Sequence, residues 1–320
     1  MSRVRTAAAP AASRVRVDVP LALVGPTASG KTEAAIALAR RLGAEILLID
    51  SMTVYRGMDV GTAKPSPEER AGVPHHLVDV ADPAEAFSVA RFQALARGAL
   101  AGIRERGCPA MLVGGSGLYF RAVVDDLEFP GTDPDLRASL EAEAASLGAP
   151  ALHRRLADLD PRAARAMEPT NARRAVRALE VAALTGRTFS SFARAWARYP
   201  ADRVRAAGVT MPPDVLRNRI EARVRRQLEE GLVDEVRDLL DRGFGSFVTA
   251  SQAIGYVEVA EHLRGRLTLD EAAERIARRT RALARRQMAW FRRDPRIRWF
   301  EAGSEGAAAL VGEFEEHYLG

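Results

Sequence analysis

The sequence predicts an α/β fold: a P-loop NTPase-like core, with a parallel sheet flanked by helices, plus a mostly helical insertion domain. Three observations support this. Short apolar runs alternate with helix-forming segments up to residue 113, which is typical of parallel sheets covered by helices on both faces. A glycine-rich loop separates the first apolar run from the first helix. From about residue 133 to 200, arginine-rich helical segments replace the apolar runs.

The strands and helices follow from hydrophobic spacing and from glycine and proline stops. The apolar run 19–24 predicts a buried strand, and residues 31–42 predict a helix ending at Gly43. Further strands are expected at 45–49, 110–113 and 204–211, and further helices at 88–106, 134–147, 150–158, 171–186, 213–230, 232–242 and 269–292. The polar positions 25–32, Asp50 and 114–117 then lie at the carboxyl ends of strands, where ligands bind in such sheets.

A length of 320 residues suffices for two modest domains, or for one domain with a large insertion. We expect a disordered N-terminal extension at 1–18, a core formed by 19–132 and 201–303, a helical insertion at 133–200, and a C-terminal tail at 304–320. The first 18 residues lack the apolar region of a secretory signal. Their lack of acids before Asp18 is a faint likeness to a transit peptide.

The composition suits a soluble globular enzyme, with 47% hydrophobic and 28% charged residues and no apolar run long enough for a membrane helix. Cys108 is the single cysteine, so an internal disulfide and a cysteine-rich metal site are excluded and a cytoplasmic location is expected. A net charge of +5 is common among proteins that contact polyanions. Lys31 and Lys64 are the only lysines, which marks both as positions where a compact ammonium is needed.

The strongest motif is GPTASGKT at residues 25–32, which fits the phosphate-loop pattern G-x-x-x-x-G-K-[ST]. Its glycines let backbone N–H groups face an anion, and the following helix adds the positive end of its dipole. Lys31 can reach the outer phosphate and Thr32 can ligate Mg²⁺. The predicted diphosphate-binding residues are Gly25, Pro26, Thr27, Ala28, Ser29, Gly30, Lys31 and Thr32. The motif does not specify which phosphate compound binds.

Asp50 has three interpretations: it holds Mg²⁺ through water, acts as a general base, or caps a turn together with Ser51. The polar, glycine-punctuated stretch 50–65 is expected to be a loop over the mouth of the sheet. A metal site at His75 and His76 is disfavoured, because neighbouring residues of a strand point to opposite faces. The glycines of 114–117 permit close approach of a ligand or form a tight strand-to-helix turn.

Arginine is concentrated in two of the expected helices. In the helix expected at 171–186, Arg173 and Arg177 lie one turn apart and share a face. The helix 269–292 carries arginines together with Trp290 and Phe291, and the arginines there and just beyond it are Arg278, Arg279, Arg281, Arg285, Arg286, Arg292 and Arg293. Arginines combined with aromatic residues suit phosphate contact and base stacking in RNA. The alternative is a solvated helix face with arginine stems packed along the surface.

Together, the motifs resemble the tRNA dimethylallyltransferases, also called tRNA isopentenyltransferases, over residues 19 to about 300. The set is specific in its order and spacing: GPTASGKT, DSM-VYRGMDVGTAKP, HHLVD, GGSGLYF, RRAVRALEV, QAIGYVE and RRQMAWFRRD. The resemblance implies transfer of a dimethylallyl group from dimethylallyl diphosphate to N6 of adenosine 37, just 3′ of the anticodon. It further implies tRNAs that read codons beginning with U, a requirement for Mg²⁺, and release of diphosphate.

The resemblance also implies roles for particular residues. The implied catalytic set is Asp50 as the base, Lys31, Thr32, Ser116, and Arg223 closing over the diphosphate. The insertion domain and the C-terminal helices of the core are expected to bind the anticodon stem-loop of tRNA. The implied tRNA contacts are Asp50, Ser51, Met52, Thr53, Ser116, Arg137, Arg173, Arg174, Ala175, Val176, Arg177, Gln252, Ala253, Ile254, Gly255, Tyr256, Val257, Arg285, Arg286, Gln287, Met288, Ala289, Trp290, Phe291 and Arg292.

Three positions depart from the family pattern. Thr53 stands where Gln is usual, Ser116 replaces a Thr, and Val257 stands where Lys is common. We expect each to soften the preference for anticodon-loop sequence, without removing the base or the phosphate-binding loop. A monomer is the expected oligomeric state.

Three other functions use parts of the same pattern. A P-loop kinase or NTPase would also need Lys31, Thr32 and Asp50, but it gives no reason for the RRQMAWFRRD helix. An adenylate isopentenyltransferase acting on free AMP or ATP would share the first half, but it needs no RNA-binding insertion. A non-catalytic RNA-binding protein would leave the phosphate loop without a role.

Overall fold

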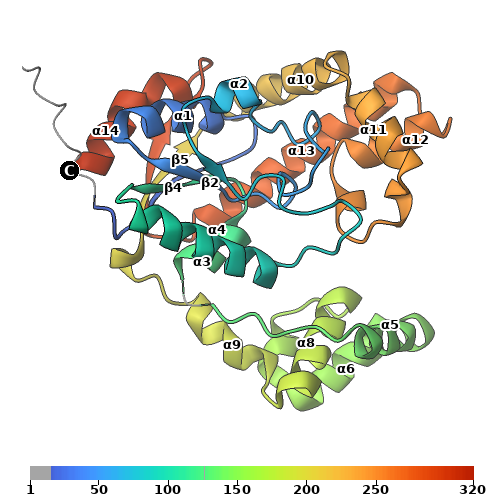
Figure 1. Ribbon diagram of the computed structural model, residues 1–320. Coiled ribbons are helices and arrows are strands. Elements are labelled where there is room, and N and C mark those ends of the chain that lie inside the picture. Colours follow the sequence, from blue (N-terminus) through green and yellow to red (C-terminus); the bar gives the residue numbers. More distant parts are fainter. Residues whose placement is uncertain (1–15, 126) are drawn as a thin grey trace, which may run out of the picture. The chain divides into compact units, whose positions relative to one another are not determined.

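The computed structural model describes residues 16–125 and 127–320 (Figure 1). Most of the expected N-terminal extension, residues 1–15, therefore lies outside the described residues. The chain divides into two compact units, one of Met1–Val124 with Ala201–Gly320 and one of Asp125–Pro200. The second unit begins eight residues before the position expected for the insertion, since it includes the segment that leads into the first of its helices.

The first unit contains a six-stranded parallel sheet with the strand order β3-β2-β4-β1-β5-β6. Its strands are β1 (Leu21–Val24), β2 (Glu45–Leu48), β3 (His75–His76), β4 (Ala110–Gly114), β5 (Arg205–Thr210) and β6 (Ile297–Glu301). The four strands predicted from apolar runs are confirmed. The edge strand β6 was not predicted, because its sequence IRWFE mixes buried and exposed residues instead of forming an apolar run.

Different helices cover the two faces of the sheet (Figure 1). Leu21 and Leu23 of β1 pack in one core cluster with α1 (Lys31–Leu42) and α14 (Val311–Leu319). Ala22 and Val24 pack in the other, with α3 (Val89–Glu105), α4 (Gly117–Val124) and α13 (Leu269–Phe291). Successive side chains of a strand point to opposite faces. Burial of both faces therefore explains why β1 is apolar throughout.

The C-terminal segment, which the sequence suggested only as a tail, folds onto this core. Residues 304–320 contain the 3₁₀ helix η4 (Ala307–Leu310) and α14. Phe314 and Tyr318 are fully buried, and the Tyr318 hydroxyl donates to the carbonyl of Ala22 at 2.7 Å. The two aromatic residues are four apart and so share one helix face. The spacing of Phe314 and Tyr318 is a short amphipathic pattern, and the helix that it forms was not predicted from the sequence.

The remaining helices of the first unit lie before β3 and after β5. A single turn, α2 (Pro67–Arg70), precedes β3, and α10 (Pro213–Glu229), α11 (Leu232–Asp241) and α12 (Tyr256–Leu263) lead to α13. The 3₁₀ turns η1 (Ala201–Arg203), η2 (Phe244–Ser246) and η3 (Ala250–Gln252) lie in the connections. Thr268 and Glu271 form a capping box that begins α13. Among the described residues, no helix is both long and apolar enough to cross a membrane.

The second unit is entirely helical in its regular structure. It contains α5 (Pro134–Leu147), α6 (Ala149–Leu159), α7 (Pro161–Arg165), α8 (Ala172–Thr185) and α9 (Phe189–Trp196). Its own core includes Leu140, Leu152, Leu156 and Leu179. Asp133 and Asn171 cap α5 and α8 by accepting backbone N–H groups. The expectation of a mostly helical insertion is confirmed.

Candidate active site

The phosphate loop connects β1 directly to α1, as its motif predicts. None of the N–H groups from Ala28 to Thr32 hydrogen-bonds to another described residue, so they can face an anion at the start of the helix. Ala28 has φ of 65°, a conformation that residues other than glycine rarely adopt. The carbonyl of Ala28 accepts a hydrogen bond from Nε of Arg219, on α10, at 2.9 Å. Arg219 thus supports the loop from outside the motif.

Lys31 lies buried inside the loop, where its Nζ donates to the carbonyl of Pro26 at 2.6 Å and to Oγ of Ser29 at 3.4 Å. Burial, followed by the nearby Arg223 guanidinium, lowers the pKa of Lys31 to about 7, and Asp50 opposes this shift. Burial also lowers the pKa of Arg223, which Asp50 again opposes. Two cations and one carboxylate therefore share a site in which Lys31 is buried and Arg223 and Asp50 are partly exposed. An anion bound there would relieve the repulsion between the cations.

Asp50 follows β2 at the same edge of the sheet. Its Oδ1 accepts the N–H of Met52 at 2.8 Å, so one oxygen caps the turn. The described residues donate no hydrogen bond to the second oxygen, which leaves it for a proton or a metal. The N–H of Ser116 donates to the carbonyl of Ile49 at 3.4 Å, which joins the 114–117 turn to the residue before Asp50. The structure thus brings Asp50, Ser116 and the phosphate loop to one edge.

Helix α10 carries three polar side chains spaced four residues apart, Arg219, Arg223 and Gln227. Arg219 binds the phosphate loop, and Arg223 Nη2 donates to the carbonyl of Thr62 at 3.3 Å. Gln227 Nε2 donates to the carbonyls of Val60 and Gly61 at 2.8 and 2.9 Å. One helix face thus connects the phosphate loop to the loop that begins at Asp50. Of these three residues, only Arg223 was predicted from the sequence, although the spacing of four indicates the other two as well.

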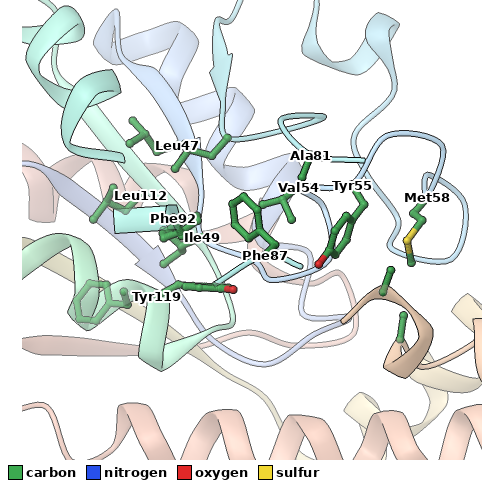
Figure 2. Packing of buried hydrophobic residues seen from close by; sticks show 14 of the residues in the cluster. Leu47, Ile49, Val54, Tyr55, Met58, Ala81, Phe87, Phe92, Leu112 and Tyr119 are labelled. Atoms are coloured by element: carbon green, nitrogen blue, oxygen red, sulfur yellow. The ribbon is translucent and has the colours of Figure 1, made fainter. Parts of the chain in front are cut away.

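The stretch 50–65 is a loop, as predicted, and it is firmly anchored. Val54, Tyr55 and Met58 are fully buried, and Figure 2 shows Val54 and Tyr55 near Phe87 and Ala81, with Met58 farther along the loop. The ammonium of Lys64 donates to the carbonyl of Tyr55 and to the carboxylates of Asp59 and Asp79, the latter two at 2.6 Å. The expectation that Lys64 supplies a compact ammonium is met, because three acceptors converge on one nitrogen.

The two adjacent histidines have structural contacts. His76 Nε2 lies 2.7 Å from Oε2 of Glu45, and His75 Nδ1 lies 2.7 Å from the carbonyl of Val73. Arg106 holds the pKa of Glu45 down at about 2, helped by His76. Among the described residues, no three His, Cys, Asp or Glu side chains group as a metal site.

Several arginines of α13, together with its C-cap Arg292, fall into two groups. Arg279 pairs with Glu258 and Arg281 pairs with Glu221. Arg285, Arg286 and Arg292 are exposed and have no acidic partner among the described residues. Phe291, expected to stack on RNA bases, is instead fully buried against Phe120 in the core. Trp290 keeps 38% of its surface exposed and is the aromatic residue of this helix that can still reach a base.

The segment 252–257 is less accessible than the sequence suggested. Ala253 and Tyr256 are buried, whereas Gln252 is exposed and Ile254 and Val257 are half-buried. Thr53 is also buried, and its hydroxyl has no hydrogen-bond partner among the described residues. The side chains of Ala253 and Tyr256 therefore support the fold and cannot contact RNA directly in this conformation.

In the second unit, the buried carboxylate of Glu180 organises two of the expected RNA-binding arginines. It accepts Nη2 of Arg137 and Nη1 of Arg177, each at 2.6 Å. Arg177 also donates to the carbonyls of Pro130 and Gly131 at 2.6 and 2.9 Å. Arg173 and Arg174 are exposed, whereas Ala175 and Val176, from the same motif, are buried. The motif therefore combines a structural part with an exposed basic part.

Comparisons with known proteins show which family this chain belongs to. The family model described as IPP transferase matches residues 53–294, and a model described as Isopentenyl transferase matches residues 19–79. A tRNA dimethylallyltransferase of Kineococcus radiotolerans is 54% identical over 89% of this chain and 92% of its own. The tRNA dimethylallyltransferase of Thermobifida fusca is 52% identical over 92% of this chain and 95% of its own.

Solved structures show the same fold. The tRNA isopentenylpyrophosphate transferase of Bacillus halodurans is 44% identical, covers 93% of this chain and 95% of its own, and has a TM-score of 0.68. A eukaryotic dimethylallyltransferase acting on tRNA has a TM-score of 0.77 at 24% identity, covering 93% of this chain and 80% of its own. The chain shares about half of its residues with the enzymes of Kineococcus radiotolerans and Thermobifida fusca over about nine tenths of its length, and the family model covers residues 53–294. The chain therefore belongs to the IPP transferase family.

Proposed function

We propose that this protein is a tRNA dimethylallyltransferase that transfers the dimethylallyl group of dimethylallyl diphosphate to N6 of adenosine 37 in tRNAs reading codons that begin with U. The observation that carries the proposal is the grouping of Lys31, Arg223 and Asp50 beside a phosphate loop. Two neighbouring cations, of which Lys31 is buried, suit a departing diphosphate, and one carboxylate suits an amine that must lose a proton. The relatives named above support this assignment.

The diphosphate would bind the N–H groups of 28–32, with Lys31 and Arg223 around it. As the bond from the allylic carbon to the diphosphate oxygen breaks, negative charge grows on that oxygen. Cations and N–H groups fixed in place before the reaction stabilise this charge without reorganising. The bond from N6 of adenine to the same carbon forms, and the proton of N6 passes to Asp50.

The residues present also fit Mg²⁺. The Thr32 hydroxyl is an oxygen ligand of the kind that Mg²⁺ prefers, whereas Asp50 keeps its second oxygen for the proton of N6. The described residues offer no larger cluster of acids or histidines, so the oxygens of the diphosphate would complete the coordination. When bound, Mg²⁺ supplies additional positive charge for the leaving diphosphate.

The tRNA would contact exposed basic residues on both units. On the first unit these are Arg285, Arg286 and Arg292 with Trp290, and on the second they are Arg173 and Arg174. Of the further expected contacts, Ser51, Met52, Met288 and Ala289 remain proposals on the strength of their motifs, whereas Gly255 is buried like Ala253 and Tyr256. Adenosine 37 must leave its stack to reach Asp50 beside Ser116.

We propose that the enzyme works as a monomer in the cytoplasm.

A direct transfer assay tests the proposal. The purified protein is incubated with Mg²⁺, dimethylallyl diphosphate and unmodified tRNA, and the digested RNA is analysed for isopentenyladenosine by mass spectrometry. AMP and ATP serve as competing acceptors in parallel reactions. Product in tRNA alone is expected. Product in AMP or ATP would point to an adenylate isopentenyltransferase, and hydrolysis of ATP without transfer would point to a kinase or NTPase.

The Asp50→Asn variant tests the proposed role of Asp50 as the base. It keeps an oxygen for the N–H of Met52 but removes the base, so kcat should fall by about 10² to 10⁴. Binding of tRNA should stay within about threefold, since the loss is confined to proton transfer. If tRNA affinity collapsed along with kcat, Asp50 would be a structural residue.

A further inference from the structure

Helix α13 presents a buried amide to the phosphate loop. Gln287 is only 9% exposed, although it lies in the arginine-rich motif expected to contact tRNA. Its Oε1 accepts the N–H of Thr27 at 2.8 Å, across 260 residues of sequence. Its neighbours Arg285 and Arg286 are exposed. Gln287 therefore faces away from the surface that the arginines form and toward the diphosphate loop.

The glycine turn after β4 is shaped around the same helix. A Cβ on Gly115 would lie 2.2 Å from Nε2 of Gln287, and a Cβ on Gly117 would lie 1.7 Å from Cδ1 of Trp290. A side chain at Gly115 would displace the amide of Gln287, and one at Gly117 would displace the ring of Trp290, which is a structural reason for glycine at each. Gln287 is thus held between the phosphate loop and the turn that carries Ser116.

We propose that Gln287 is a positioning residue of the diphosphate site rather than an RNA contact. The N–H of Thr27 stands immediately before the free N–H groups of 28–32. By binding Thr27, Gln287 fixes the start of the loop, so the following N–H groups converge on the diphosphate. A neutral amide suits this place, because a carboxylate would accept the same hydrogen bond but repel the diphosphate. This inference rests on the proposed function, since that function supplies the diphosphate.

Binding of inorganic pyrophosphate with Mg²⁺ to the full chain, measured by calorimetry, tests the inference without any transfer reaction. Gln287→Met keeps the length of the side chain but removes the acceptor, and it should weaken pyrophosphate binding about tenfold. Gln287→Glu keeps the acceptor but adds a buried charge next to the diphosphate, so it should weaken binding at least as much. Both variants should bind tRNA within about threefold of the wild type.

The neighbouring Arg286→Ala is the matched control. It should bind pyrophosphate as the wild type does and bind tRNA more weakly. Should the Gln287 variants fail to fold, Gly115→Ala displaces the amide without changing it and should give the same loss of pyrophosphate binding.

Two results would overturn the inference. Wild-type pyrophosphate affinity in Gln287→Met combined with weakened tRNA binding would make Gln287 an RNA contact. Equal loss of both ligands would make its role a general structural one. The proposed function fails separately, in the transfer assay: transfer to AMP instead of tRNA would leave the pyrophosphate result standing.

Discussion

The hydroxyl of Tyr256 donates a hydrogen bond to Oε1 of Glu235 at 2.5 Å. The same carboxylate accepts the N–H groups of Asp59, Val60 and Gly61 at 2.8, 2.8 and 3.1 Å. Burial, reinforced by Glu235, raises the pKa of Tyr256 well above its usual value, so the phenol stays protonated and keeps donating. A tyrosine expected to contact tRNA therefore helps to hold the loop that begins at Asp50.

Glu235→Gln should lower the free energy of unfolding by about 2 to 3 kcal/mol. The amide replaces one of the two acceptor oxygens by an NH₂ group, so two of the four donors lose their acceptor. Tyr256→Phe removes one donor and should cost about 1 kcal/mol. Urea unfolding of both variants measures this difference. Asp234→Asn changes an exposed neighbour on α11 and should stay within about 0.5 kcal/mol. Equal effects at Glu235 and Asp234 would contradict the anchoring role.

Lys64 offers a second test of the same loop. Its side chain is 4% exposed, whereas Asp59 and Asp79 are 59% and 37% exposed and can be hydrated, so Lys64→Met should cost about 1 to 2 kcal/mol through the lost hydrogen bonds. Lys64→Arg should also destabilise the protein, because a planar guanidinium cannot direct its donors to three acceptors around one point. Arg91→Ala, which breaks an exposed pair with Glu85, should cost less than about 1 kcal/mol. Thermal unfolding of the three variants compares them, and rescue by arginine would contradict the argument.

Lys31 links diphosphate binding to stability. Its pKa is about 7 in the folded protein, against an ordinary value of 10.5. Below pH 7 the folded chain must bury a charged Lys31, so the cost to stability is at its maximum. Between pH 7 and 10.5 the unfolded chain holds a proton that the folded chain lacks, so this cost falls as pH rises. Lys31→Met should therefore bind no pyrophosphate, yet be more stable than the wild type.

The gain in stability should be about 1 to 4 kcal/mol at pH 6 and should shrink toward pH 10. Urea unfolding at pH 6, 8 and 9.5 measures it. Arg217→Met, on an exposed position of α10, is the control that should show no such pH dependence. A gain that is constant with pH would mean that Lys31 titrates normally and that the site does not hold it at a lowered pKa.

Local patterns predicted the sheet core and the phosphate loop because their signals are continuous along the chain. The apolar runs of β1, β2 and β4, and the glycines and lysine of 25–32, each lie within one short segment. What could not be predicted depends on contacts between distant segments. Gln287 reaches Thr27, Glu235 reaches Val60, and Tyr318 reaches Ala22. A motif also mixes exposed and buried residues, so Arg286 and Phe291 looked alike as RNA contacts although only Arg286 is exposed.

The arginines of the second unit allow the exposed and structural parts of one motif to be separated. Arg173 and Arg174 are exposed, whereas Arg177 binds Glu180, which is fully buried. Despite burial, Arg137 and Arg177 hold the pKa of Glu180 below its usual value, so the carboxylate is charged and depends on them. Replacement of Arg173 should affect RNA binding, and replacement of Arg177 should affect folding.

Arg173→Ala with Arg174→Ala should leave the free energy of unfolding within about 0.5 kcal/mol of the wild type. The slope of log affinity for an anticodon stem-loop RNA against log salt should become shallower by about 1 for each phosphate that the double variant no longer binds. Arg177→Ala should instead cost about 3 kcal/mol, because it leaves Glu180 buried with one cation fewer. RNA titrations at several KCl concentrations, paired with urea unfolding, distinguish the two classes. An unchanged salt slope in the double variant would show that this face of α8 is merely solvated, because phosphate binding by arginine must release counterions.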